Sequence, residues 1–286
     1  LGQRLLRQMY YNVLRCSNDE LFLSFAKAIA VCRKNQITRL EGLRRSFRIL
    51  RGAVAVDGQG HLFFGEYFGN SKREAVHIYR YVGGSGIAEV VHTFAPGEVR
   101  HVHGIYHDPF DGSLWCLTGD RRDECRILRS EDGFASATTV GQGDESWRAV
   151  SVLFAPEGAY YAMDAEFEQN YLYRLDRNSG RRERSASIDG PVYYSQKLGS
   201  DLLFAVTAEL CPSQSDRHAS LWHVAENTDP QKILSLPKDR WHKKLFMPGT
   251  IHFPYVRDGN LEEGVLLSGV GLQPFDGGAW RLRRKR

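Results

Sequence analysis

Short apolar segments that end in a basic or polar residue recur along the whole chain. Clear copies cover residues 78–80, 127–129, 172–174 and 221–223, and their last residues stand 49, 45 and 49 positions apart. Residues 279–281 repeat the pattern near the end of the chain, and residues 29–31 lie one further step before the first of these copies. Six copies at a nearly constant spacing predict six similar structural units.

Further apolar segments flank most copies. The segments directly ahead of them cover residues 21–24, 62–65, 114–117, 159–162, 202–205 and 265–268. The first segments of the units cover residues 52–56, 101–106, 149–154, 192–196 and 250–254, and the last ones cover 89–94, 138–141, 185–188 and 233–236. Four strands per unit predict an all-β chain, a single β-propeller domain over residues 1–286 with about six four-stranded blades.

The last unit ends after its third strand, at residues 280–283. A blade that stops there would expose an unpaired edge. We expect the N-terminal segment, residues 3–9, to add the missing outer strand and close the ring. Its Leu5 and Leu6 would equally suit the start of a short helix.

Composition excludes several classes of protein. With 42% hydrophobic residues and 28 glycines the chain can fill a large core, and its apolar stretches are far shorter than the roughly 20 residues of a membrane-spanning helix. The net charge of +4 comes partly from the basic end, residues 281–286, which we expect to be a solvated tail rather than a nucleic-acid site. The five cysteines lack C-x-x-C spacing, so no disulfide framework, metal site or cofactor is predicted.

The composition gives little information on location. We expect the cytoplasm by default. A first residue of Leu1 rather than Met leaves removal of a signal peptide, and with it secretion or the periplasm, open.

Three arginines fall at the same position of three consecutive units. Arg51, Arg100 and Arg148 stand at the heads of the first strands, 49 and 48 residues apart. Since first strands line the central channel of a propeller, we expect the three side chains to meet at one rim. A guanidinium group offers a planar fork of donors that fits a carboxylate, so the set predicts a site for an acidic saccharide or other small anion. Ion pairs that join neighbouring blades would explain the same residues.

Carboxylates follow the second strands in the same units. Glu66, Asp120 and Asp164 are candidates for the general acid and the nucleophile or base of glycosidic cleavage. Candidates for binding the ligand on the same rim are Tyr67, Tyr193 and Glu209. Structural ion pairs explain any single carboxylate as well, so the site is indicated by the set.

Two histidines open one of the first strands. Alternation along a strand places His101 and His103 on one face, toward the channel or the neighbouring blade. They are candidate ligand-binding residues. A metal ion would require a third protein ligand, which the pattern does not supply, so no metal site is predicted.

One turn carries a family resemblance. Residues 127–134, Ile-Leu-Arg-Ser-Glu-Asp-Gly-Phe, resemble the Asp-box (BNR repeat), the Ser-x-Asp-x-Gly-x-x-Trp hairpin of sialidase-like propellers, with Gly133 here directly after Asp132. The resemblance implies the propeller fold and a preference for sugars or other anionic ligands. Sialidases also use an arginine triad, a Tyr–Glu pair and an Asp. The arginines here come from three consecutive units, so the sialidase mechanism is not carried over.

Three functions are compatible with these patterns. The first is a carbohydrate-active propeller that binds an acidic saccharide in its channel and, like a glycoside hydrolase, could cleave it. The second is a non-catalytic binding or scaffold propeller whose arginines form ion pairs between blades. The third is a metal-assisted polysaccharide lyase or hydrolase centred on the two histidines.

Overall fold

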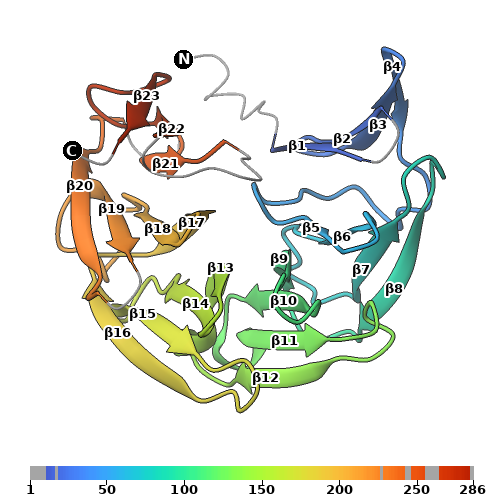
Figure 1. The fold of residues 1–286 in the computed structure, drawn as a ribbon, viewed down its shortest axis with the longest axis horizontal. Helices are drawn as coiled ribbons and strands as arrows, with labels where there is room; N and C mark the ends of the chain where they lie inside the picture. Colours follow the sequence, from blue (N-terminus) through green and yellow to red (C-terminus); the bar gives the residue numbers. More distant parts are fainter. Residues whose placement is uncertain (1–10, 17–18, 226–227, 242–245, 255–263, 284–286) are drawn as a thin grey trace. The chain divides into compact units, whose positions relative to one another are not determined.

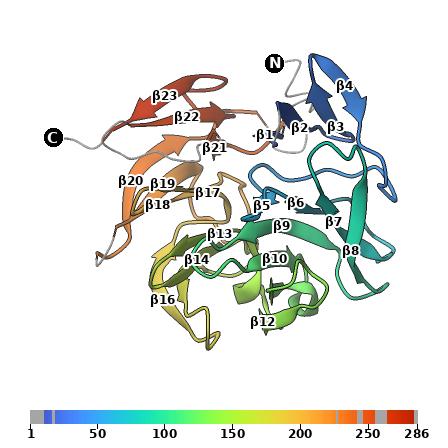
Figure 2. The same cartoon turned by 45° about the vertical axis from the view of Figure 1, so that its right-hand side comes forward.

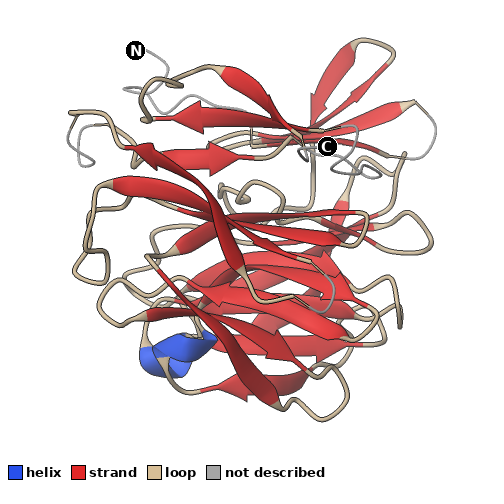
Figure 3. Cartoon of the chain, turned by 60° about the vertical axis from the view of Figure 1, so that its left-hand side comes forward, coloured by secondary structure: helices blue, strands red, loops and turns tan. Residues whose placement is uncertain are grey.

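The computed structural model describes residues 11–16, 19–225, 228–241, 246–254 and 264–283. Strands dominate these residues, and the helical segments among them are two short 3₁₀ turns, η1 (Arg122–Glu124) and η2 (Glu145–Trp147) (Figure 3). Within the described ranges, no helix is long and apolar enough to cross a membrane. The segment predicted to close the ring, residues 3–9, lies outside the described residues.

The described strands form six antiparallel sheets, five with four strands and one with three. In every sheet each strand is hydrogen-bonded to the strand that precedes or follows it in the chain. Such successive up-and-down sheets are the blades of a β-propeller, and the predicted all-β fold class is confirmed. The described residues divide into two compact units, one that ends at Arg148 and one that begins at Ala149.

The first unit contains three blades, coloured blue to green in Figure 1. Their strands are β1 (Asn12–Arg15), β2 (Glu20–Ser24), β3 (Ile29–Arg33), β4 (Gln36–Arg39), β5 (Ala55–Val56), β6 (Leu62–Gly65), β7 (Val76–Tyr81), β8 (Ala88–Phe94), β9 (His101–His107), β10 (Leu114–Gly119), β11 (Arg126–Ser130) and β12 (Thr138–Gln142).

The second unit contains the other three sheets, which Figure 2 shows in yellow to red. Their strands are β13 (Ala149–Ala155), β14 (Gly158–Met163), β15 (Asn170–Leu175), β16 (Arg182–Ile188), β17 (Val192–Leu198), β18 (Asp201–Val206), β19 (His218–Val224), β20 (Gln231–Pro237), β21 (Thr250–His252), β22 (Val265–Val270) and β23 (Ala279–Leu282). The described part of the last sheet has three strands, as the sequence predicts.

Burial explains the sequences of the second strands in the sheets. Every residue of β6, β10, β14 and β18 is buried. A strand covered on both faces is apolar almost throughout, without the alternation of a strand that has one wet face. The fourth strands β4 and β12 have no buried residue, and they lie at the edges of their sheets.

The first strand of the second blade is shorter than predicted. It covers Ala55–Val56, whereas the sequence predicts residues 52–56. Gly52 instead lies in a turn with a φ of 74°, a conformation that favours glycine. Asn12 fixes this turn, because its amide donates to the Leu50 carbonyl (3.0 Å) and its Oδ1 accepts from the Gly52 N–H (2.7 Å).

The turn that resembles an Asp-box is held by its own side chains. Ser130 Oγ accepts from the Phe134 N–H at 2.8 Å, and Asp132 accepts from the backbone N–H and the hydroxyl of Ser136 at 2.9 and 2.6 Å. Phe134 is buried at a φ of 69° and packs against Phe63 of the preceding blade. The turn therefore also joins two blades.

Asp189 joins two blades of the second unit. It directly follows β16 and accepts hydrogen bonds from Ser220 Oγ (2.8 Å), Trp222 Nε1 (2.9 Å) and Lys232 Nζ (3.1 Å), which belong to β19 and β20 of the next blade. Burial by itself raises the pKa of Asp189, but hydrogen bonds from Trp222, Ser220 and Lys232 outweigh it, so the pKa is below its ordinary value.

We expect the Asp189→Ala substitution to lower the free energy of unfolding by about 1–2 kcal/mol at pH 7, since it leaves the buried hydroxyl of Ser220 and the half-buried Nε1–H of Trp222 without their acceptor. A carboxyl with a lowered pKa stabilises the fold above its unfolded value of about 3.9, and this contribution is lost as the pH falls. Urea denaturation should therefore show a difference from wild type that narrows below about pH 4. Glu183→Ala, which removes an exposed carboxylate, is the control. A difference that stays constant down to pH 3 would refute the interpretation.

Candidate functional site

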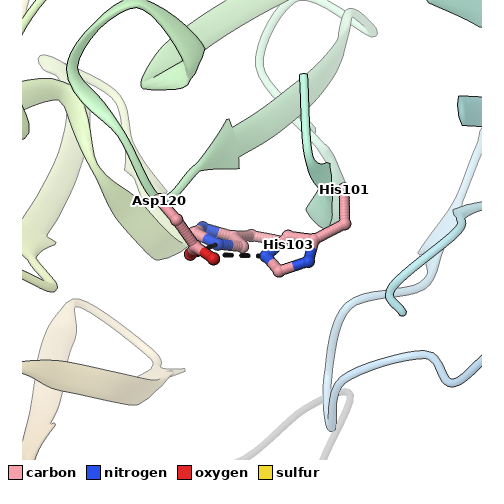
Figure 4. Close-up of side chains that lie close together, drawn as sticks. All are labelled: His101, His103 and Asp120. Carbon is pink, nitrogen blue, oxygen red and sulfur yellow. Dashed lines mark hydrogen bonds and ion pairs between the residues drawn. The ribbon is translucent and has the colours of Figure 1, made fainter. Parts of the chain in front are cut away.

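The pairing of β9 with β10 brings three predicted site residues together. The two strands are antiparallel, with Gly119 opposite His101 and Thr118 opposite Val102. Asp120 directly follows β10 and therefore lies beside the start of β9, where His101 and His103 project from one face (Figure 4). The register shifts between Leu117 and Thr118, an irregularity of the kind that often lies next to functional sites.

Asp120 is the centre of this group. Its Oδ1 lies 3.4 Å from Nε2 of His101 and 3.4 Å from Nε2 of His103. Arg100 Nη1 contacts Oδ2 at 2.6 Å, and Arg148 Nη2 lies 3.7 Å from Oδ1. We call these five residues the Asp120 cluster, and all of them belong to the first unit.

Neighbouring residues fix the two imidazoles. His101 Nδ1 lies 3.1 Å from the Phe68 carbonyl oxygen, which can only accept a hydrogen bond. The Tyr67 ring packs on His101 with centroids 4.1 Å apart, and the guanidinium of Arg48 lies 4.9 Å from the Tyr67 centroid. A Cβ atom on Gly119 would lie 2.6 Å from the His103 ring, so this close approach requires glycine.

The electrostatics keep the central carboxylate ionised. Burial by itself raises the pKa of Asp120, but the imidazoles of His101 and His103 more than offset this effect, and the pKa is well below its ordinary value. The side chains of His101 and His103 are only 3% and 2% exposed, whereas that of Asp120 is 17% exposed. The carboxylate is therefore partly accessible to solvent.

Two kinds of chemistry suit this arrangement. Two imidazole nitrogens and a carboxylate oxygen within 4.8 Å of one another are a possible ligand set for a metal ion. Guanidinium groups beside them suit the carboxylate of a bound molecule. The contacts between Asp120 and the two arginines are also those of a structural ion-pair cluster.

Glu66 has a different environment. Its side chain is fully buried and accepts from Tyr79 Oη (2.8 Å) and the His77 N–H (3.1 Å), with Arg45 Nε 3.6 Å away. Burial raises the pKa of Glu66 more than these partners lower it. These contacts support a structural role for Glu66. They give no direct support to the catalytic role predicted for it.

The other predicted residues are distributed over both units. Arg51 lies in the turn before β5 instead of directly before the strand, as Arg100 and Arg148 do before β9 and β13. In the second unit, Asp164 is buried after β14, Tyr193 belongs to β17, and Glu209 follows β18. That these residues share one site with the Asp120 cluster stays a prediction.

Sequence reasoning found the members of the cluster but not their contacts. The sequence pattern predicts a catalytic role for Asp120 and supplies no third partner for the two histidines. The hairpin of first and second strands was a sufficient signal, because antiparallel pairing places the residue after the second strand beside the head of the first. Arg48 and the Phe68 carbonyl lie on other segments and gave no such signal.

Comparison with known proteins identifies the fold and no family. No protein-family model matches the sequence, and the search of curated proteins found no match. The fold is similar to that of a protein described as TolB from Agrobacterium tumefaciens, with a TM-score of 0.55 and 11% identity over 80% of this chain and 82% of that one. It is also similar to an oligogalacturonate lyase in complex with manganese, with a TM-score of 0.55 and 10% identity over 84% and 72% of the two chains.

A third similar structure is that of a prolyl endopeptidase, with a TM-score of 0.57 and 8% identity. The alignment covers 96% of this chain but only 42% of the peptidase. Identities this low show the β-propeller fold alone, and the two enzymes among these structures, a lyase and a peptidase, catalyse different reactions. The Asp-box and sialidase-like type has no support from these matches and stays a prediction.

Proposed function

We propose that this propeller binds an acidic saccharide, or another small molecule that carries a carboxylate, at the Asp120 cluster. The main support for this proposal is the position of Arg100 and Arg148. They come from the heads of consecutive first strands and contact the same carboxylate, that of Asp120, which is partly accessible to solvent. Residues 48 positions apart in the sequence thus meet at one point, together with two imidazoles.

Arg100 is the residue best suited to contact the ligand. Its side chain is 36% exposed, and the contact with Asp120 uses Nη1. A guanidinium group has five N–H donors, so an ion pair with one carboxylate does not exhaust it. Charge-assisted bonds from such a fork to a ligand carboxylate are among the stronger polar contacts in proteins.

The named substrate of one structural neighbour suggests which ligand to try first. Oligogalacturonate carries a carboxylate on each sugar, which is the chemistry proposed for this site. Binding is the core of the proposal. Cleavage would need a second reactive group beside Asp120, and Glu66 has no exposed surface to supply it. Cleavage of the saccharide is therefore tested separately from binding, by looking for shorter sugar products.

A second candidate function is a non-catalytic scaffold. The 2.6 Å contact between Arg100 and Asp120 favours it, because an arginine that already has a carboxylate partner can simply join structural elements. Under this alternative the Asp120 cluster stabilises the blades and a partner binds elsewhere on the propeller.

Titration calorimetry with trigalacturonate and with a neutral trisaccharide of equal length distinguishes saccharide binding from the scaffold function. We expect binding of the acidic sugar alone, and a loss of about 10- to 100-fold in affinity in Arg100→Ala, the equivalent of one charge-assisted contact of about 1.5–3 kcal/mol. Arg51→Ala and Arg148→Ala should act similarly if all three arginines share the site. Arg80→Ala, which removes an arginine paired with Glu89, should bind normally.

The opposite result would identify the scaffold. If wild type binds neither sugar and Arg100→Ala or Arg148→Ala unfolds the protein, the arginines serve stability and the saccharide proposal fails. Circular dichroism of each variant before titration keeps the two outcomes apart.

A further inference from the structure

The spacing of the nitrogen and oxygen atoms in the Asp120 cluster matches metal coordination better than hydrogen bonding. Both Nε2–Oδ1 distances are 3.4 Å, so the hydrogen bond between His103 and Asp120 is longer than the 2.7–3.2 Å of ordinary N–H···O bonds. Two donors that each lie about 2.1 Å from a zinc-like ion, at the tetrahedral angle, are about 3.4 Å apart. The two imidazoles therefore stand at the distance from the carboxylate oxygen that a shared ion would set.

The contact between His101 and the Phe68 carbonyl supports the same conclusion. The Phe68 carbonyl accepts at 3.1 Å, so Nδ1 of His101 carries a proton, and in the neutral ring the lone pair is on Nε2. That Nε2 is buried and has no hydrogen-bond partner among the described residues. It faces Oδ1 of Asp120, which also offers only lone pairs. A nitrogen and an oxygen that both present lone pairs face each other favourably only when a positive charge lies between them, which is either a proton or a metal ion.

The surroundings resemble those of known metal sites. Metal-binding imidazoles commonly donate their other N–H to a backbone carbonyl, as His101 does to Phe68, and metal-binding carboxylates are usually hydrogen-bonded themselves. Arg100 holds Oδ2 of Asp120, which leaves Oδ1 directed at the two histidines. The exposure of Asp120 would leave room for water or a ligand on the ion.

We propose that His101, His103 and Asp120 bind a divalent transition-metal ion, with Zn²⁺ and Co²⁺ best suited to the spacing. Three protein ligands with an accessible side are the arrangement of a catalytic or ligand-binding metal centre rather than a closed structural one. The ion would add positive charge beside Arg100, where the saccharide carboxylate is proposed to bind. The inference does not depend on that function, because the metal ion alone can test it.

The test is a titration of the full, metal-stripped chain with Zn²⁺ by calorimetry and with Co²⁺ by absorption. We expect one equivalent per chain, and a Co²⁺ spectrum without a thiolate band, since the ligands are nitrogen and oxygen. His101→Gln and His103→Gln should each lower the affinity by at least about 100-fold. His77→Gln is the matched control, because His77 is also on a strand and its imidazole contacts Thr93 instead of a carboxylate.

A measurement on the wild-type chain guards against variants that fail to fold. Nitrogen-detected NMR of the imidazoles should show the Nε2 signals of two histidines shift when one equivalent of Zn²⁺ is added. The proposal is overturned if no stoichiometric binding occurs at millimolar Zn²⁺, Co²⁺ or Mn²⁺, or if binding survives both histidine substitutions. Metal binding without saccharide binding would support this inference while refuting the proposed function.

Discussion

Replacing Asp120 by asparagine is expected to lower the free energy of unfolding by about 2–3 kcal/mol at neutral pH in metal-free buffer. The carboxylate lies 2.6 Å from Arg100 and 3.7 Å from Arg148, and the substitution removes its charge from both. Loss of one partner from a fully buried ion pair costs about 3–5 kcal/mol. The 36% exposure of Arg100 reduces this value, because solvent screens the remaining charge. Urea denaturation followed by circular dichroism measures the difference.

Glu89→Gln provides the matched control for Asp120→Asn. Glu89 pairs with Arg80 at 2.8 Å, but the two side chains are 62% and 39% exposed. An exposed pair of this kind contributes less than about 1 kcal/mol. If Asp120→Asn costs no more than Glu89→Gln, the Asp120 cluster is not an electrostatic centre of the first unit, and its residues are held in place by other contacts.

The sequence was sufficient for the architecture because the segments of the third strands recur at a nearly constant spacing and the second strands ahead of them are buried on both faces. Strands such as β10 and β14 are apolar almost throughout, and they recur at a nearly constant spacing. In the first blade, the apolar pattern does not indicate every strand. Its strand β4 has four exposed residues and no apolar pattern, and β1 begins with Asn12, a polar residue that is buried because it fixes the next blade's turn.

Part of the candidate site could be predicted in the same way. The repeat placed Arg100 and Arg148 at the heads of consecutive first strands, and hairpin pairing places Asp120 beside His101. Arg51 differs because it lies in a turn with Gly52, which adopts a positive φ, and strand β5 begins only at Ala55. The spacing of 49 residues between Arg51 and Arg100 gives no indication of this local change in the backbone.

The finer geometry depends on contacts between distant segments. The carbonyl that fixes the tautomer of His101 belongs to Phe68, which is 33 positions away in the preceding blade. Whether the histidines lie at hydrogen-bonding or metal-coordinating distance from Asp120 depends on Gly119, whose missing side chain lets His103 approach β10. A residue-type pattern contains neither piece of information.

Replacing Glu66 by alanine is expected to cost about 3–5 kcal/mol in unfolding free energy, the largest effect predicted for the chain. The substitution leaves the hydroxyl of Tyr79, which is itself fully buried, without its 2.8 Å acceptor and the His77 N–H without its 3.1 Å acceptor. It also removes the carboxylate near Arg45, whose side chain is 26% exposed. Each buried donor left without a partner costs about 1–3 kcal/mol, so the loss of two of them reaches the stated range.

Glu74→Ala is the control that distinguishes the effect of burial on Glu66 from the effect of its charge beside Arg45. Glu74 pairs with the same Arg45 at 2.8 Å but is 57% exposed, so its loss should cost less than about 1 kcal/mol. The pair of variants also tests the predicted catalytic role of Glu66, because a structural carboxylate should lower stability without changing trigalacturonate affinity in the fraction that remains folded. An unchanged melting temperature in Glu66→Ala, together with lost binding or turnover of the sugar, would instead assign Glu66 to the ligand, since a side chain that contributes nothing to the core must be retained for another reason.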